Sequence, residues 1–195
     1  MAENRDRRDL LCDAAIEVLA GEGGRGLTHR AVDRAAELPE GTAKNYFPTR
    51  DSLLQATAER CVERYWSELQ QAEAHSAEEL RALLREMMDR ALTVNRSRLL
   101  AYLELHAEAA RNARVRQTLA RLTRADLDLH LSAQRAAGLP ATRQSAAVVT
   151  LAVNSALTYL LTQPPDVLAS YGLDDLDAFL GRLIASACPG SGLAG

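Results

Sequence analysis

Apolar residues recur along most of the chain at the three- and four-residue spacing of an α-helix. The first stripe contains Leu11, Ala14, Ala15, Val18 and Leu19, and a glycine-rich segment at 21–26 follows it. No Asn-Gly or Asp-Gly dipeptide, the usual turn of a β-hairpin, separates alternating apolar runs. The pattern therefore predicts an all-α protein with about nine helices.

Capping residues and prolines set the predicted helix boundaries. Thr28 can cap a short second helix, Pro39 suits the first position of a third, and Thr49 can cap a long fourth helix. Ser76 and Glu79 form an S-x-x-E capping box that begins a fifth helix. Four more helices are expected at 98–110, 115–137, 142–163 and 174–187. Thr142 can cap the third of these, and Pro164-Pro165 would end it.

The three short helices and the roughly six longer ones that follow indicate two domains. We place the boundary near Pro48, which gives a domain over 1–48 and a second, helical domain over 49–195. The predicted fourth helix would link the two mechanically.

Composition narrows the class of protein. Hydrophobic residues make up 47% of the chain, enough to build a core, and the net charge of −3 argues against coating nucleic acid through bulk charge. The three cysteines lie far apart without a C-x-x-C pair, which indicates a reducing compartment, and we expect a cytoplasmic protein. The four histidines form no H-x-x-x-H pair, and no nucleophile–base arrangement is readable, so we expect no metal, no cofactor and no enzyme.

One uncharged run, 144–165, is long enough to cross a bilayer. Eight of its 22 residues are polar. We therefore expect a helix buried in a core or an oligomer interface, and no membrane partner.

The segment 28–47 carries the functional signal and reads T-H-R-A-V-D-R-A-A-E-L-P-E-G-T-A-K-N-Y-F. A short helix, a tight turn and another short helix have the size of a helix-turn-helix unit. The exposed face of the second helix would carry Glu40, Thr42, Lys44, Asn45 and Tyr46. Lys and Tyr suit phosphate oxygens, whereas Asn and Thr suit base edges in the major groove.

Charge neither supports nor excludes DNA binding by this segment, and short helix pairs with polar outer faces also occur in ordinary helical proteins. Residues 1–50 hold 8 basic and 9 acidic side chains. Arg5, Arg7 and Arg8 precede the first helical stripe, where a flexible arm could reach a phosphate or the minor groove.

Residues 10–54 resemble the N-terminal DNA-binding domain of the TetR family of bacterial transcriptional regulators. The matching pieces are L-L-C-D-A-A-I-E-V-L-A-G-E-G-G-R-G-L-T (10–28), R-A-V-D-R-A-A (30–36) and L-P-E-G-T-A-K-N-Y-F-P-T-R-D-S-L-L (38–54). The closing pattern, G-T followed by Y-F-P-x-[KR]-[DE]-x-L-L, is fairly specific. The resemblance covers about a quarter of the chain.

Four residues depart from the family's common pattern. Glu37 stands where the turn usually has Gly, so we expect a non-glycine residue with positive φ, at a cost of roughly 1 kcal/mol. Pro39 replaces the usual Ser or Thr and loses a side-chain cap, Lys44 stands where Tyr is common, and Arg50 stands where Lys is common.

The resemblance implies a homodimer that binds a palindromic double-stranded DNA operator and is released by a small-molecule effector. The two recognition helices would then lie about 34 Å apart, in successive major grooves. The residues expected to contact DNA are Arg5, Thr28, Arg30, Thr42, Lys44, Asn45, Tyr46, Thr49 and Arg50.

The second domain would bind the effector and form the dimer. Large or polar-tipped side chains expected to line the ligand site are Trp66, Met88, Tyr102, His106, Asn154 and Thr158. Residues expected at the dimer interface are Leu151, Ser155, Phe179 and Leu183, although their stripe equally suits packing within one subunit. The alternative function is a helical module that binds a small molecule or a protein and no longer engages DNA.

Overall fold

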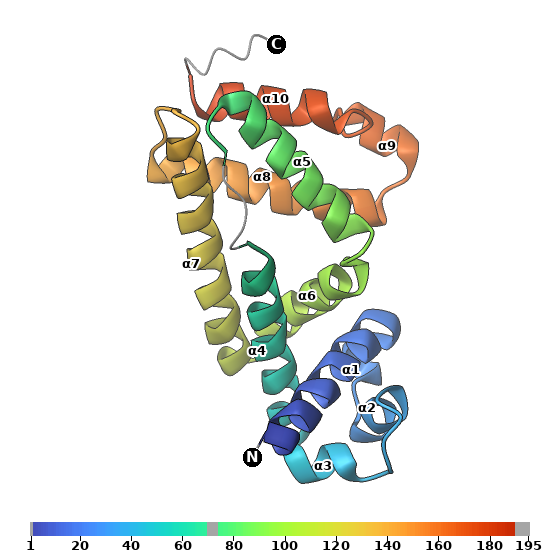
Figure 1. Cartoon of the computed structure of the whole chain (residues 1–195). Coiled ribbons are helices and arrows are strands. Elements are labelled where there is room, and N and C mark those ends of the chain that lie inside the picture. Colours follow the sequence, from blue (N-terminus) through green and yellow to red (C-terminus); the bar gives the residue numbers. More distant parts are fainter. Residues whose placement is uncertain (1, 70–73, 190–195) are drawn as a thin grey trace. The chain divides into compact units, whose positions relative to one another are not determined.

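The computed structural model describes residues 2–69 and 74–189, and every regular element in these ranges is a helix. This confirms the predicted all-α class. The ten helices (Figure 1) are α1 (Ala2–Gly26), α2 (His29–Ala35), α3 (Thr42–Tyr46), α4 (Arg50–Leu69), α5 (Ala77–Leu92), α6 (Arg96–Ala109), α7 (Ala113–Ala136), α8 (Arg143–Thr162), α9 (Pro165–Ser170) and α10 (Leu176–Ala187).

Four predicted caps are present as hydrogen bonds, among them that of Thr49, which accepts from the Ser52 amide at 3.1 Å. Thr28 accepts from the Ala31 amide at 3.2 Å, and Ser76 accepts from the Glu79 amide at 3.1 Å. Thr142 and Ser145 form a reciprocal capping box at the start of α8. Each cap satisfies a backbone donor that the first turn of a helix leaves open.

One helix start was predicted wrongly, and one short helix was not predicted. The third helix begins at Thr42 instead of Pro39, because the Thr42 amide and hydroxyl both donate to the Pro39 carbonyl and so close a turn ahead of the helix. The prolines after α8 do end that helix, but they also begin the additional helix α9. Pro164 is its N-cap and Pro165 occupies its first position, where a missing amide costs no hydrogen bond.

The packing of the chain defines two compact units. Unit 1 comprises Met1–Gln70 and Asn95–Leu122, and unit 2 comprises Gln71–Val94 and Thr123–Gly195. In this grouping α4, α6 and the first half of α7 belong with α1–α3, so the packing divides the chain elsewhere than residue 48. The functional division into 1–48 and 49–195 stays a prediction.

Unit 1 is built around α1, which packs against α2, α4 and α6. Its core is aliphatic, and fully buried members come from four helices: Leu11 and Leu19 on α1, Val32 on α2, Leu54 on α4 and Leu105 on α6. Burial of side chains of this kind stabilises a fold by about 1.5–3 kcal/mol each.

Unit 2 contains the mutually packed helices α5, α8 and α10. Its buried side chains include Leu84 and Met88 on α5, Val153 on α8, and Leu180 and Ile184 on α10. Within the described ranges, α8 alone is long and apolar enough to cross a membrane by length and composition. It packs against α5 and α10, and 39% of its apolar window is buried within the protein.

Candidate DNA-binding interface and ligand-binding residues

The position of the recognition helix α3 is fixed by a buried carboxylate on α2. Asp33 is 2% exposed, and its two oxygens accept from the Gly41 amide at 2.7 Å and the Ala43 amide at 2.6 Å. One side chain therefore satisfies two backbone donors at the start of α3. The linear pattern predicted that the helix lacks a side-chain cap at Pro39, and it did not indicate this cap from α2.

The turn between α2 and α3 uses left-handed backbone at two places. Glu37 has φ 55°, which confirms the predicted positive φ at a residue other than glycine. Gly41 has φ 94°, a conformation that L side chains rarely adopt, and no heavy atom lies within 4 Å of the place where a Cβ would stand. A second side chain holds the far end of α3, since His29 Nε2 donates to the Phe47 carbonyl at 2.6 Å.

Lys44 and Asn45 are the residues of α3 whose side chains are exposed. Tyr46 is only partly exposed, because its ring packs against the hydrophobic core of unit 1. Thr42 is half-buried and its hydroxyl is already bonded to the Pro39 carbonyl. Of the expected contacts on this helix, Lys44 and Asn45 are therefore the two free to meet a DNA surface.

Four of the expected contacts outside α3 are exposed but are engaged within the protein. Arg30 pairs with Glu40 at 2.9 Å across the helix-turn-helix, and both side chains are exposed. Thr28 and Thr49 cap α2 and α4 through their hydroxyls. The Arg50 guanidinium donates to the Gly24 carbonyl, so it is directed at the end of α1.

The prediction of a flexible N-terminal arm is wrong. Helix α1 begins at Ala2, so Arg5, Arg7 and Arg8 are helical residues. Arg8 packs over the Phe47 ring at 5.5 Å and lies 3.9 Å from Glu59, and these contacts hold the first turns of α1 against the rest of unit 1. Arg5 is exposed on this helix, and its contact with DNA stays a prediction.

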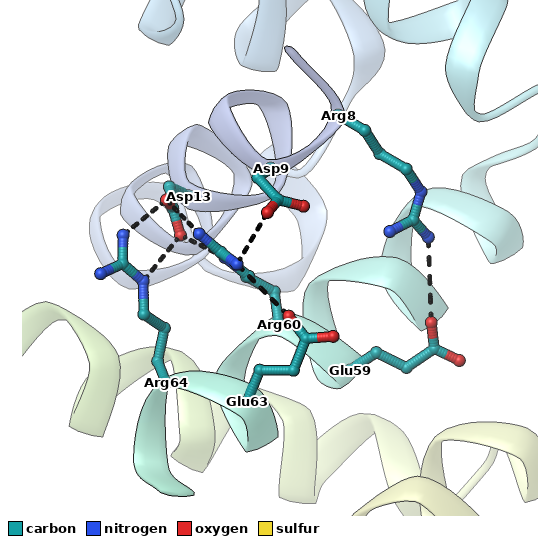
Figure 2. A network of polar contacts seen from close by, with 7 residues as sticks. All are labelled: Arg8, Asp9, Asp13, Glu59, Arg60, Glu63 and Arg64. Atoms are coloured by element: carbon teal, nitrogen blue, oxygen red, sulfur yellow. Dashed lines mark hydrogen bonds and ion pairs between the residues drawn. The ribbon is translucent and has the colours of Figure 1, made fainter. Parts of the chain in front are cut away.

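A network of charged side chains joins α1 to α4 (Figure 2). Arg60 donates to both Asp13 oxygens, at 2.8 and 3.0 Å, and to Asp9 at 3.1 Å, while Arg64 also donates to Asp13. Burial opposes ionisation of Asp13, yet the hydrogen bonds from Arg60 and Arg64 outweigh it and lower the pKa of the Asp13 carboxyl. The hydrogen bond to Asp13 in turn raises the pKa of Arg60. A bidentate contact between a guanidinium and a carboxylate orients both groups in addition to attracting their opposite charges.

A second link joins α6 to the end of α1. Gly23 has φ 68°, which kinks the end of α1, and the next amide, that of Gly24, donates to Glu104 Oε2 of α6 at 2.9 Å. Because Arg50 binds the Gly24 carbonyl, both polar groups of this residue are held by side chains from other helices. Glu104 gave no sequence signal, since it lies 80 positions from its partner.

The expected ligand residues fall in both units. In unit 1, Tyr102 and His106 contact each other in a T-shaped arrangement with ring centroids 4.4 Å apart. His106 lies on the exposed surface of α6. Its ring is nevertheless partly desolvated by its neighbours, which lowers its pKa. Trp66 belongs to α4, but its side chain lies outside the described part of the structure.

In unit 2, Met88 is buried in the core, and Asn154 is half-buried and contacts the buried residue Asp126. Asn154 donates to Asp126 Oδ2 at 3.4 Å, and His130 Nε2 lies 3.6 Å from Asp126 Oδ1. Burial, opposed by the Asp126 charge, lowers the pKa of His130. Thr158 donates to the Asn154 carbonyl at 3.0 Å, so both expected ligand residues of α8 have partners within the protein.

The expected dimer residues differ in exposure. Leu151 is 68% exposed and Ser155 is also exposed, whereas Phe179 and Leu183 on α10 are partly buried. Val148, one turn before Leu151, is 51% exposed, so α8 presents uncharged side chains to the surface. In the described ranges no three His, Cys, Asp or Glu side chains come together as a metal site.

A helix-turn-helix unit joined to a larger set of helices is the architecture of a helix-turn-helix transcriptional regulator, and comparison with known proteins agrees. Residues 75–186 match the family model described as the tetracyclin repressor-like C-terminal domain. The chain belongs to the TetR family of transcriptional regulators and is not an enzyme.

Individual relatives support this assignment. An uncharacterized HTH-type transcriptional regulator in the dhlA 5' region of Xanthobacter autotrophicus is 33% identical over 94 residues, which span 46% of this chain and 46% of that protein. A crystal structure of a TetR-family transcriptional regulator from Rhodococcus sp. is 26% identical with a TM-score of 0.70, and the match covers 96% of this chain and 100% of that one. The multidrug binding protein EbrR complexed with ethidium is 26% identical with a TM-score of 0.63, over 91% of this chain and 98% of that one.

Proposed function

We propose that this regulator is a cytoplasmic repressor that binds a palindromic operator as a homodimer and is released by a small molecule. The observation that carries the proposal is the geometry of α3. The helix is held at its start by Asp33 and presents Lys44 and Asn45 outward. A rigid helix with a polar outer face suits the major groove, where Asn reads adenine and Lys reads guanine or binds phosphate.

The remaining expected contacts surround this helix within unit 1. Thr28 and Thr49 lie at the starts of α2 and α4, where backbone amides favour phosphate oxygens. Arg30 and Arg50 would each exchange a contact within the protein for a DNA phosphate. We assign Arg5 and Tyr46 to flanking contacts.

A small-molecule effector is supported by a relative. EbrR is described as a multidrug binding protein and has been solved with ethidium, proflavin and malachite green. We extend to this chain the capacity to bind such aromatic molecules, with Trp66, Met88, Tyr102, His106, Asn154 and Thr158 as the candidate contacts. Dimerisation would use the exposed uncharged face of α8, with Leu151 and Ser155, together with Phe179 and Leu183 of α10.

DNA binding is tested by selecting duplexes from a random library with the wild-type chain and measuring their affinity by fluorescence anisotropy. We expect the selected duplex to be palindromic and to bind with a Kd of about 10⁻⁸ M or lower, and a scrambled duplex to bind much more weakly. Lys44→Ala should weaken binding, either equally for all sequences with a salt slope reduced by about 1, or by about 1–3 kcal/mol at one base position. If no duplex is enriched, the chain is instead a helical binding module that does not engage DNA.

Effector binding is tested on the protein alone, because ethidium and proflavin also bind duplex DNA. We expect calorimetry to detect malachite green or ethidium binding to the wild-type chain, and the Tyr102→Ala variant to bind it at least several-fold more weakly. Glu17→Ala, which changes an exposed residue of α1, serves as the control. Equal binding by the Tyr102 variant and the control would remove Tyr102 from the site.

A further inference from the structure

Positive charge is concentrated outside the helix-turn-helix. Residues 1–50, which contain the candidate DNA-binding unit, carry 8 basic and 9 acidic side chains. Residues 109–125 carry five arginines and no acidic residue, in a chain whose net charge is −3. This is the largest acid-free basic run in the sequence, and none of the expected DNA contacts lies in it.

The run forms an exposed stripe on α7. Arg114, Gln117 and Arg121 follow each other at spacings of three and four residues, so they share one face of the helix, and all three are exposed. Val115 and Leu119 face the core of unit 1 and are 0% and 2% exposed. The stripe therefore lies on the side of α7 that is turned away from the core.

Most of these charges are not neutralised within the protein. Arg111 pairs with Glu108 at 3.4 Å and Arg116 donates to the Ala109 carbonyl. Arg114, Arg121 and Arg124 form no ion pair with any residue in the described part of the chain. Arginines placed together on one face without carboxylates repel each other and attract a polyanion.

The start of this stripe belongs to the same unit as the recognition helix. Gln55 of α4 donates to Thr118 of α7 at 2.7 Å, and Figure 1 shows the first half of α7 beside α4. Gln55 lies five residues after Arg50, which corresponds to about 7.5 Å along α4. The basic stripe is thus anchored close to the end of α4 that carries the expected phosphate contacts Thr49 and Arg50.

We propose that the arginine stripe of α7, centred on Arg114 and Arg121, binds phosphates of the same DNA molecule that α3 engages. The inference rests on the proposed DNA-binding function and adds a second contact surface to it. Arg114 and Arg121 are about 10.5 Å apart along the helix axis, so the two side chains can contact different phosphates of one DNA molecule. Guanidinium groups suit phosphate because their planar donors bind two oxygens at once.

The test is the salt dependence of binding to the duplex selected by the wild-type chain, between about 50 and 200 mM KCl. The variants are Arg114→Gln/Arg121→Gln, the charge-retaining Arg114→Lys/Arg121→Lys, and Arg135→Gln. Arg135 is a matched control, since it is an exposed arginine near the other end of α7. Thermal unfolding of each variant verifies that it is folded, as expected for exposed positions.

Removal of one phosphate-binding charge lowers the slope of log K against log salt by about 0.9, so the double glutamine variant should lose about 2 for each protomer bound. The lysine variant and Arg135→Gln should keep the wild-type slope, and the preference for the selected over the scrambled duplex should not change. A glutamine variant with the wild-type slope overturns the inference while leaving α3 as the reader, and would direct attention to an acidic protein as partner. If the wild-type chain enriches no duplex, the proposed function fails and the inference with it.

Discussion

Removal of the Asp33 carboxylate should destabilise the helix-turn-helix more than any exposed aspartate could. The side chain is 2% exposed and accepts from two backbone amides, at 2.7 Å from Gly41 and 2.6 Å from Ala43. A hydrogen bond to a charged group contributes about 1.5–3 kcal/mol, and an orphaned buried donor costs about 1–3 kcal/mol. Water can reach the Gly41 amide in part, so we expect Asp33→Ala to cost about 3 kcal/mol in total.

Thermal unfolding followed by circular dichroism measures this cost. For a chain of this size 1 kcal/mol shifts Tm by about 2–4 °C, so Asp33→Ala should melt about 6–12 °C below the wild type. Asp33→Asn keeps one acceptor oxygen but turns an amide donor toward a backbone N–H. The Tm of this variant should therefore lie between that of Asp33→Ala and that of the wild type. Asp174→Ala, which removes an exposed aspartate, is the control and should change Tm by about 1 °C or less.

A result within about 1 °C of the wild type for Asp33→Ala would refute the reasoning, because it would mean that the two amides find equivalent partners without the carboxylate. Loss of DNA binding by Asp33→Asn with a nearly unchanged Tm would also contradict it, since the proposed role acts through the stability of α3.

Three further predictions concern titratable groups. The pKa of Asp13 is lowered in the folded chain, so the ionised carboxylate contributes stability above its unfolded pKa of about 4. This contribution is lost as the pH falls through the folded pKa. In urea titrations at decreasing pH, Asp13→Asn should therefore lose less stability than the wild type. The pKa of His130 is also lowered, so the unfolded chain takes up its proton first, and stability should fall below about pH 6.5 in the wild type but less in His130→Gln. Burial raises the pKa of Cys12 to about 11 and that of Cys61 to about 12, so both thiols should react with a disulfide reagent much more slowly in the native chain than in denaturant; equal rates would contradict their burial.

Local signals in the sequence predicted much of the fold because the interactions behind them span only a few residues. Thr28, Ser76 and Thr142 cap helices through bonds to amides three positions away, and each cap was found where the pattern placed it. The positive φ of Glu37 followed from its position in the turn. Helix starts at prolines were less predictable, because Pro39 suits a turn as well as a first helical position.

The sequence predicted which residues could form the candidate DNA interface, but not which of their side chains bind other groups of the protein. The sequence indicated that Lys44 and Asn45 would be exposed, and they are. It did not indicate that Thr42, Arg30 and Arg50 would each bind another group of the protein, because those partners are set by how the helices pack.

The sequence by itself determined the helical class, most helix boundaries, the helix-turn-helix segment and its resemblance to TetR-family regulators. Periodicity and capping act over three or four residues, so a linear pattern records them directly. Tertiary structure alone decided that Asp33 caps α3, that Arg60 joins Asp13 across 47 positions, and that Asn154 meets Asp126 across 28. These pairs form because packing of apolar faces brings distant helices together, and the linear pattern does not specify which polar groups then meet.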